Sequence, residues 1–102
     1  MGLATALTFV GVGRIIEIGD LSEVNNTNTI SAKIECERRR SSGSENIVTT
    51  DVFWIRIWDT GANVFKDKAK VGDSVSLVGE IRNQRGMFDL KVNKFEIYSG
   101  GE

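Results

Sequence analysis

Five runs rich in β-branched and aromatic residues are spread along this 102-residue chain, and glycine, asparagine, aspartate and serine separate them. Residues of this kind suit a pleated, half-buried strand, and closely spaced turn residues are typical of a small all-β domain. The chain contains no proline, so the other turn-forming residues must make every turn. A chain of this length can build one modest core. We therefore expect one domain over residues 1–102, with a short flexible C-terminus at 99–102.

The five runs occupy residues 7–18, 29–37, 51–58, 74–82 and 87–98. Two glycines in the first run, Gly11 and Gly13, would let that strand bend sharply and serve both sides of a small barrel. The second run alternates, which predicts one buried face made of Ile30, Ala32, Ile34 and Cys36. In the fourth run, Gly79 is expected to mark a bend.

The last run changes parity along its length. Phe88, Leu90 and Val92 share one parity, whereas Phe95 and Ile97 share the other. A bulge adds one residue to a strand and moves the following side chains to the opposite face. We therefore expect a bulge near Asn93 that keeps both sets inside, and a short turn at 83–86 that joins this run to the fourth.

The connections between the runs complete the predicted topology. Residues 38–50 are polar and are expected to form a long, mobile hairpin loop. Val64, Phe65 and Ala69 have rough helical spacing, which predicts one or two helical turns between the third and fourth strands. The expected fold is all-β, a five-stranded OB-fold Greek-key barrel with a short helix between strands 3 and 4, an architecture whose outer face commonly binds oligonucleotides.

Composition excludes several classes of protein. The formal net charge is −1, which argues against a uniformly basic coat for nucleic acid. The chain has no histidine and one cysteine, Cys36, so we expect no internal disulfide, no metal site, no cofactor and no enzymatic nucleophile–base pair. No apolar run approaches the roughly 20 residues of a membrane span. We expect no membrane partner and an intracellular, cytoplasmic location.

The third run carries the candidate binding face. If Phe53, Ile55 and Ile57 form a core face, then Trp54, Arg56 and Trp58 stand on the solvent side of the sheet. Exposed indoles are unfavourable unless another surface covers them. Single-stranded bases stack on aromatic rings, and a guanidinium can pair with phosphate, so this face suits single-stranded nucleic acid. Alternatively, the tryptophans pack beneath the long loop or against a partner subunit.

Basic residues cluster around this face in the predicted topology. Arg38, Arg39 and Arg40 lie at the base of the long hairpin, and Arg82 and Arg85 flank the turn between the last two strands. Phosphate contacts from such residues make affinity fall as salt is added. The full set of candidate nucleic-acid-binding residues is Trp54, Arg56, Trp58, Arg38, Arg39, Arg40, Arg82, Arg85, Lys33 and Lys91.

The sequence resembles the bacterial and phage single-stranded DNA-binding proteins, as a minimal or phage-like member. The similar segments are VGRII at 12–16, ISAKIEC at 30–36, DVFWIRIW at 51–58, ANVF at 62–65 and VGDSVSLVGEI at 71–81. Each motif is degenerate, and their order along nearly the whole chain carries the resemblance. It implies an OB-fold, and it implies assembly into dimers or tetramers.

The resemblance transfers binding residues only in part. Trp58 matches a stacking aromatic that the family places at the end of this strand. Val52 stands where many members carry another tryptophan, and Arg40 stands near a further aromatic position, so those contacts are absent or replaced. The family's acidic tail, which recruits replication proteins, is not present in the sequence.

These observations lead to one main expectation of function and several alternatives. We expect sequence-independent binding of single-stranded DNA, in support of replication, repair or recombination, at the nucleoid of a bacterial or phage-infected cell. Replication proteins are expected as further partners. An OB-fold module for protein–protein assembly and a single-stranded RNA-binding domain remain alternatives, and the sequence offers nothing that detects a 2′-hydroxyl.

Overall fold

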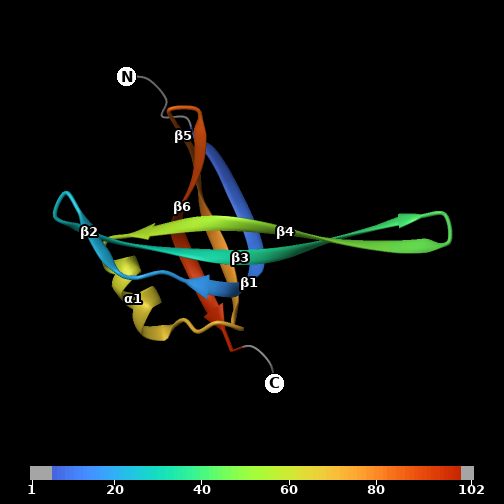
Figure 1. Ribbon diagram of the computed structural model, residues 1–102, viewed down its shortest axis with the longest axis horizontal. Helices are drawn as coiled ribbons and strands as arrows, with labels where there is room; N and C mark the ends of the chain where they lie inside the picture. The colour runs from blue at the N-terminus through green and yellow to red at the C-terminus, as the bar shows by residue number, and fades with distance from the viewer. Residues whose placement is uncertain (1–5, 100–102) are drawn as a thin grey trace.

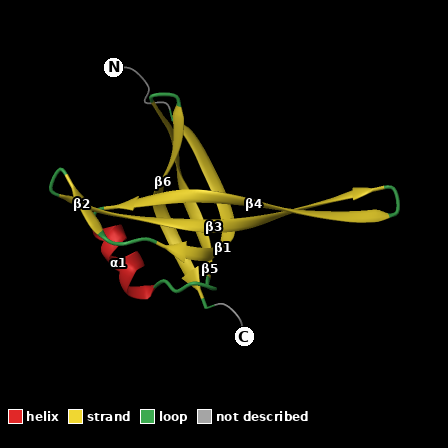
Figure 2. Ribbon diagram, viewed as in Figure 1, coloured by secondary structure: helices red, strands yellow, loops and turns green. Residues whose placement is uncertain are grey.

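A computed structural model describes residues 6–99 of the chain, apart from the side chain of Gln84. Within these residues, six strands and one helix follow one another (Figures 1 and 2). The elements are β1 (Leu7–Ile18), β2 (Ser22–Val24), β3 (Thr27–Ser42), β4 (Glu45–Trp58), α1 (Thr60–Lys68), β5 (Ser74–Gln84) and β6 (Met87–Tyr98).

The sheet closes on itself because β1 pairs with two different strands. The strand order is β1-β5-β6-β4-β3-β2, and an additional pairing between β1 and β3 completes the ring. β1 pairs with β5 from Leu7 to Arg14 and with β3 from Arg14 to Ile18. This confirms the expected OB-fold barrel and the expected role of the first strand. β2 was not expected; it pairs only with β3 and lies outside the closed ring.

The core fills the barrel, and α1 covers part of it. The predicted alternation in β3 is confirmed, since its apolar face is buried except for Cys36, which is half-buried. α1 contributes Ala62 and Phe65 to the core, and the Phe65 ring meets the Phe95 ring edge to face with 5.4 Å between centroids. The predicted helix is therefore confirmed, although Val64 lies on its exposed side. The buried apolar residues are Ile15, Ile30, Ala32, Ile34, Ile55, Ile57, Ala62, Phe65, Ala69, Val75, Leu77 and Val92.

Two residues expected in the core are exposed. Phe53 is 42% exposed and Phe88 is 77% exposed. Both lie beyond the closed part of the barrel: Phe53 stands on β4 toward the end that leaves the body, and Phe88 stands close to the β5–β6 turn. Alternation correctly predicts the face of the strand on which each side chain lies. It does not show whether the barrel covers that face at that point along the strand.

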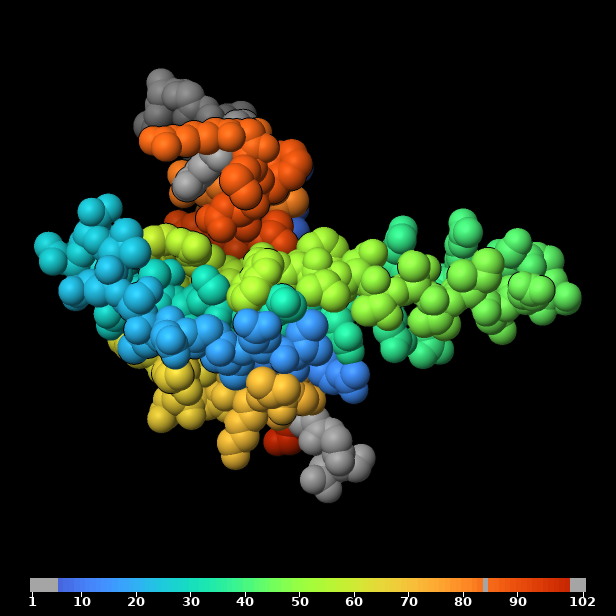
Figure 3. All heavy atoms as spheres, viewed as in Figure 1, coloured from blue at the N-terminus to red at the C-terminus, as the bar shows by residue number. Residues whose placement is uncertain are grey.

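Residues 38–50 form a hairpin, as expected, but it consists of paired strands that continue β3 and β4 and not of a loop. The two strands stay paired as far as Ser42 and Glu45, and Gly43 and Ser44 form the turn. The resulting ribbon extends well away from the body of the molecule (Figures 1 and 3). The β-branched run at 47–50 was the overlooked signal, since such residues favour strands even in a polar segment.

The bulge in β6 lies where the change of parity predicts it. Val78 is paired with Lys94 and Gly79 with Val92, which leaves Asn93 as an extra residue on β6. Gly79, the expected bend, stands opposite this irregularity. A Cβ atom at Gly79 would overlap the backbone oxygen of Lys91 and would lie 2.7 Å from the Phe9 ring. The bulge thus brings two backbones and a phenyl ring together at a position that only glycine fits.

Gly79→Ala is expected to lower the free energy of unfolding by about 1–3 kcal/mol, the usual range for an overpacked interior. The matched control is Gly11→Ala, because a Cβ at Gly11 meets no heavy atom within 4 Å. Urea unfolding of both variants measures the difference. Equal stability of the two variants would show that the β6 bulge can relax around a methyl group.

Candidate nucleic-acid interface

The outer face of β4 carries the two tryptophans of the chain. Ile55 and Ile57 point into the core and are each 2% exposed, so Trp54, Arg56 and Trp58 point outward as the alternation predicts. Trp54 is 50% exposed, whereas Arg56 and Trp58 are partly buried. Apolar ring surface therefore remains open to solvent on this face.

A cation stands beside each tryptophan ring. The Nζ atom of Lys33, which is paired with Trp54 across β3 and β4, lies 4.9 Å from the centroid of the Trp54 ring. The Cζ atom of Arg56 lies 5.8 Å from the centroid of the Trp58 ring. Such cation–π contacts are worth about 0.5–1 kcal/mol at exposed sites and help to hold the rings in place. Lys33 also forms an ion pair with Glu17 at 3.4 Å.

Arg56 retains hydrogen-bonding capacity that the protein does not use. Its Nε atom is buried and makes no hydrogen bond with any of the described residues. A buried donor without a partner is unfavourable by about 1–3 kcal/mol. An acceptor that enters from outside and reaches this guanidinium would therefore be stabilised.

Two open cavities lie on this face, one beside each tryptophan. The first has a volume of about 400 Å³ and is lined by Gly19, Asp20, Ser31, Trp54, Ile55, Arg56 and Asp89. The second has a volume of about 300 Å³ and is lined by Thr27, Trp58, Asp59, Arg82, Asp89 and Lys91. Each cavity contains one tryptophan and at least one basic residue, and Asp89 borders both.

The neighbouring strands supply the other basic residues of this face. β4 and β6 run parallel, and Arg56 is paired with Lys91. β6 in turn pairs with β5, where Arg82 stands opposite Asp89. The structure thus brings together six of the predicted residues, and we call this set the tryptophan face: Lys33, Trp54, Arg56, Trp58, Arg82 and Lys91.

The remaining predicted arginines lie apart from the tryptophan face. Arg38, Arg39 and Arg40 stand on the β3–β4 ribbon, where they line a separate hollow with Thr49. Arg38 forms an ion pair with Asp51 at 3.0 Å, and Arg39 forms one with Glu37 at 3.2 Å. Ion pairs this exposed are weak and leave the arginines able to exchange partners.

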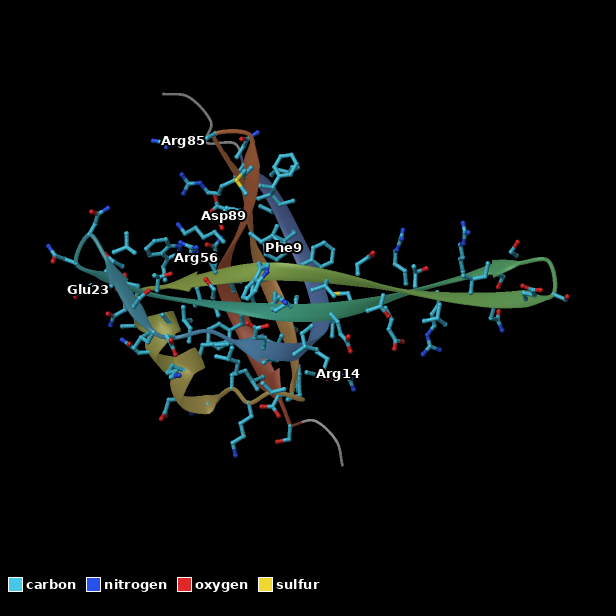
Figure 4. All side chains as sticks on the ribbon, in the orientation of Figure 1. Phe9, Arg14, Glu23, Arg56, Arg85 and Asp89 are labelled. Carbon is cyan, nitrogen blue, oxygen red and sulfur yellow. The ribbon has the colours of Figure 1, made fainter. Side chains whose placement is uncertain are left out.

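Arg85 occupies the turn between β5 and β6. Its φ is 54°, and the following backbone N–H of Gly86 donates a hydrogen bond to the side chain of Asn83 at 3.0 Å. Arg85 borders neither tryptophan cavity, and it lies at the tip of the hairpin in Figure 4. The β3–β4 ribbon and this hairpin therefore carry basic residues outward from two sides of the tryptophan face.

Sequence reasoning missed several residues of this region. Asp89 has the same parity as Lys91 on β6 and could have been found from that alternation. Phe88 was expected inside the barrel. Instead it borders an apolar groove of about 550 Å³, next to Trp54, that is lined by Leu7, Val52, Phe53, Trp54, Ile81, Phe88 and Leu90.

The surroundings of Cys36 do not activate its thiol. Burial raises the pKa of the Cys36 thiol, and the nearby charge of Asp51 acts in the same direction. A raised pKa keeps the thiol protonated and weakly nucleophilic. Among residues 6–99, no group of three or more His, Cys, Asp or Glu side chains is arranged to hold a metal ion. The helix in this part of the chain is too short and too polar to cross a membrane.

Comparison with known proteins gives matches at the level of structure. No family model and no curated protein sequence matches this chain. The mitochondrial single-stranded DNA-binding protein Rim1 of Saccharomyces cerevisiae superposes with a TM-score of 0.79 at 18% identity, covering 97% of this chain and 100% of Rim1.

Two bacterial proteins are similar as well. The small single-stranded DNA-binding protein of Streptomyces coelicolor has a TM-score of 0.71 at 14% identity, covering 91% of this chain and 94% of its own. The protein PriB of Ralstonia solanacearum has a TM-score of 0.74 at 11% identity, covering 91% of this chain and 97% of its own. At identities this low the TM-scores show a shared fold alone, so the chain has the OB-fold that these proteins also adopt.

Proposed function

We propose that this chain binds single-stranded DNA on the tryptophan face. One observation carries the proposal: two partly exposed tryptophans and an arginine stand on the outer face of one strand, and basic residues from three neighbouring strands surround them. Bases can stack on the two rings, because every base has a π face. Arg56, Lys33, Lys91 and Arg82 are placed to contact the phosphates between stacked bases.

Stacking and phosphate contacts both contribute to the binding free energy. Base–aromatic stacking contributes about 1–3 kcal/mol per base and depends little on base identity. Each phosphate that a basic side chain neutralises also releases counterions, which makes binding depend on salt. The proposed binding is therefore largely independent of sequence.

The β3–β4 ribbon and the β5–β6 hairpin would extend the contact. Arg38, Arg39, Arg40 and Arg85 stand on these two projections, within reach of a strand that leaves the tryptophan face. To contact phosphate, Arg38 and Arg39 exchange their exposed carboxylate partners for the DNA backbone. These exchanges cost little, because exposed ion pairs are weak.

The biological setting is part of the proposal. The protein acts in replication, repair or recombination at the nucleoid of a bacterial or phage-infected cell. It assembles into a dimer or tetramer and contacts replication proteins. The resemblance to single-stranded DNA-binding proteins supports these roles. An isolated two-stranded ribbon is only marginally stable. The length of the β3–β4 ribbon thus favours a partner, either DNA or a second subunit, that covers it.

A protein-assembly module is the second candidate function. The apolar groove that contains Phe53 and Phe88 favours it, because Phe88 is 77% exposed and such surfaces mark interfaces. In that case Trp54, which also lines the groove, would lie in a subunit contact. A permanent contact of this kind is insensitive to salt, which separates the two candidates.

Titration of the intrinsic tryptophan fluorescence tests the proposal. Oligo-dT and oligo-dC of equal length are expected to quench the emission, and added salt is expected to reverse the quenching with a log–log slope of about −0.7 per phosphate contact. Single-stranded RNA of the same length is titrated in parallel. Unchanged emission with all three oligonucleotides would reject nucleic-acid binding, and quenching by RNA alone would favour an RNA-binding domain.

A further inference from the structure

The tryptophan face contains one carboxylate that phosphate binding does not explain. Asp89 stands on β6 and borders both the Trp54 cavity and the Trp58 cavity. Figure 4 shows it between Arg85 at the hairpin tip and Arg56 on β4. An acidic group at this position repels the DNA backbone and by itself weakens binding.

Asp89 is unpaired although cations surround it. Arg82 is its direct partner across β5 and β6, and Arg56 borders the same cavity. Nevertheless, the Asp89 carboxylate forms no ion pair and no hydrogen bond within residues 6–99, and its side chain is partly buried. A partly desolvated carboxylate retains its full capacity to accept hydrogen bonds and benefits when a donor reaches it.

Stacked bases bring donors to this position. A base on Trp54 or Trp58 lies in a cavity that Asp89 borders, so its edge can face the carboxylate. Cytosine presents an exocyclic amino group at N4 and adenine one at N6, and a carboxylate accepts from such groups. Thymine has no exocyclic amino group, and its one N–H donor on the pairing edge, at N3, lies between two carbonyl oxygens that repel a carboxylate.

We propose that Asp89 is a specificity residue that favours bases with exocyclic amino groups over thymine and uracil. The inference rests on the proposed binding of single-stranded DNA and adds a preference to it. Stacking still accepts every base, and Asp89 adds a hydrogen bond that is strongest with an exocyclic amino group. A site with an unfilled polar group discriminates against a ligand that leaves it unpaired.

Asp89→Asn is the first test of this role. The change removes the negative charge and gives position 89 its own amide donor, which can reach the O4 atom of thymine. The measured quantity is the ratio of the affinity for oligo-dC to the affinity for oligo-dT. This ratio is expected to be about 5- to 20-fold higher in the unaltered protein than in Asp89→Asn, which is the lower part of the range for one specific base contact. Binding is measured by anisotropy of labelled oligonucleotides at mildly alkaline pH, where cytosine is neutral.

The matched control is Glu23→Gln, which changes the net charge by the same amount. Glu23 is exposed on β2 and borders neither tryptophan cavity. This control is expected to raise the affinity for both oligonucleotides slightly and equally. An equal gain for both in Asp89→Asn would mean that Asp89 acts only as a charge, and the proposal would be overturned.

A second test alters the DNA and leaves the protein unchanged. Dimethylation of cytosine at N4 removes both N–H donors and keeps the ring, so this oligonucleotide is expected to lose the advantage of oligo-dC over oligo-dT. Retention of the advantage would overturn the inference even if Asp89→Asn failed to fold. If no oligonucleotide bound at all, the proposed function would fail together with it, whereas binding without the preference would remove only the role of Asp89.

Discussion

The double variant Trp54→Ala/Trp58→Ala is expected to bind single-stranded DNA about 30-fold to 20,000-fold more weakly than the unaltered protein. Each stacked base contributes about 1–3 kcal/mol, and a tenfold change in affinity corresponds to about 1.4 kcal/mol. Both rings stand on the outer face of β4, where truncation leaves Ile55 and Ile57 in the core undisturbed. The loss therefore reports on binding rather than on folding.

The measurement needs an external probe, because the double variant has no tryptophan left. Anisotropy of a labelled oligonucleotide at low salt gives the affinity, and the two single variants divide the loss between the rings. Tyr98→Ala is the matched control: Tyr98 is an aromatic residue that is 48% exposed and borders neither cavity. Affinity within about twofold of the unaltered protein would show that the tryptophans do not stack on bases.

Sedimentation of the same variant distinguishes the assembly candidate. If the tryptophans lie in a permanent subunit contact, the double variant dissociates into smaller species in addition to losing affinity for DNA. If they serve DNA, the oligomeric state of the free protein stays the same. The two results separate a binding face from a buried interface on the same residues.

Phe65→Ala is expected to lower the free energy of unfolding by about 3–5 kcal/mol, the usual loss when a buried phenylalanine is truncated. Phe65 is fully buried on α1 and packs edge to face on Phe95. A small domain has a total stability of about 5–15 kcal/mol, so this one change removes a large share of it. The effect arises because α1 is attached to the barrel chiefly through this ring and Ala62.

Urea unfolding followed by circular dichroism measures the loss. Val64→Ala on the same helix is the matched control, because Val64 is 44% exposed and alanine favours helix. Its stability is expected to stay within about 0.5 kcal/mol of the unaltered protein. A loss below about 1 kcal/mol for Phe65→Ala would mean that the core collapses around the missing ring.

Local pattern was enough to predict most of the strands and one face of the candidate site. β1 and β6 begin and end at the predicted residues, and the Asn93 bulge follows from a change of parity within a single run. The outward placement of Trp54, Arg56 and Trp58 follows from the same period of two. These features depend only on neighbours in the sequence, because successive side chains of a strand point to opposite faces.

Strand length and the extent of the core were less predictable. The β3–β4 ribbon continues through residues that are polar enough to resemble a loop, since ladder hydrogen bonds need no apolar side chain. Phe53 and Phe88 have the parity of core residues and are nevertheless exposed. Whether a side chain of the right parity is covered depends on where the barrel closes.

The sequence by itself determined which residues form strands and which of them share a face. Only the tertiary structure decided which strands lie side by side: the closure of β1 onto β3, the parallel pairing that sets Lys91 beside Arg56, and the place of Asp89 between the two tryptophan cavities. The physical reason is that side-chain alternation is a property of one strand. Register between strands distant in sequence depends instead on how the whole sheet twists and closes around its core.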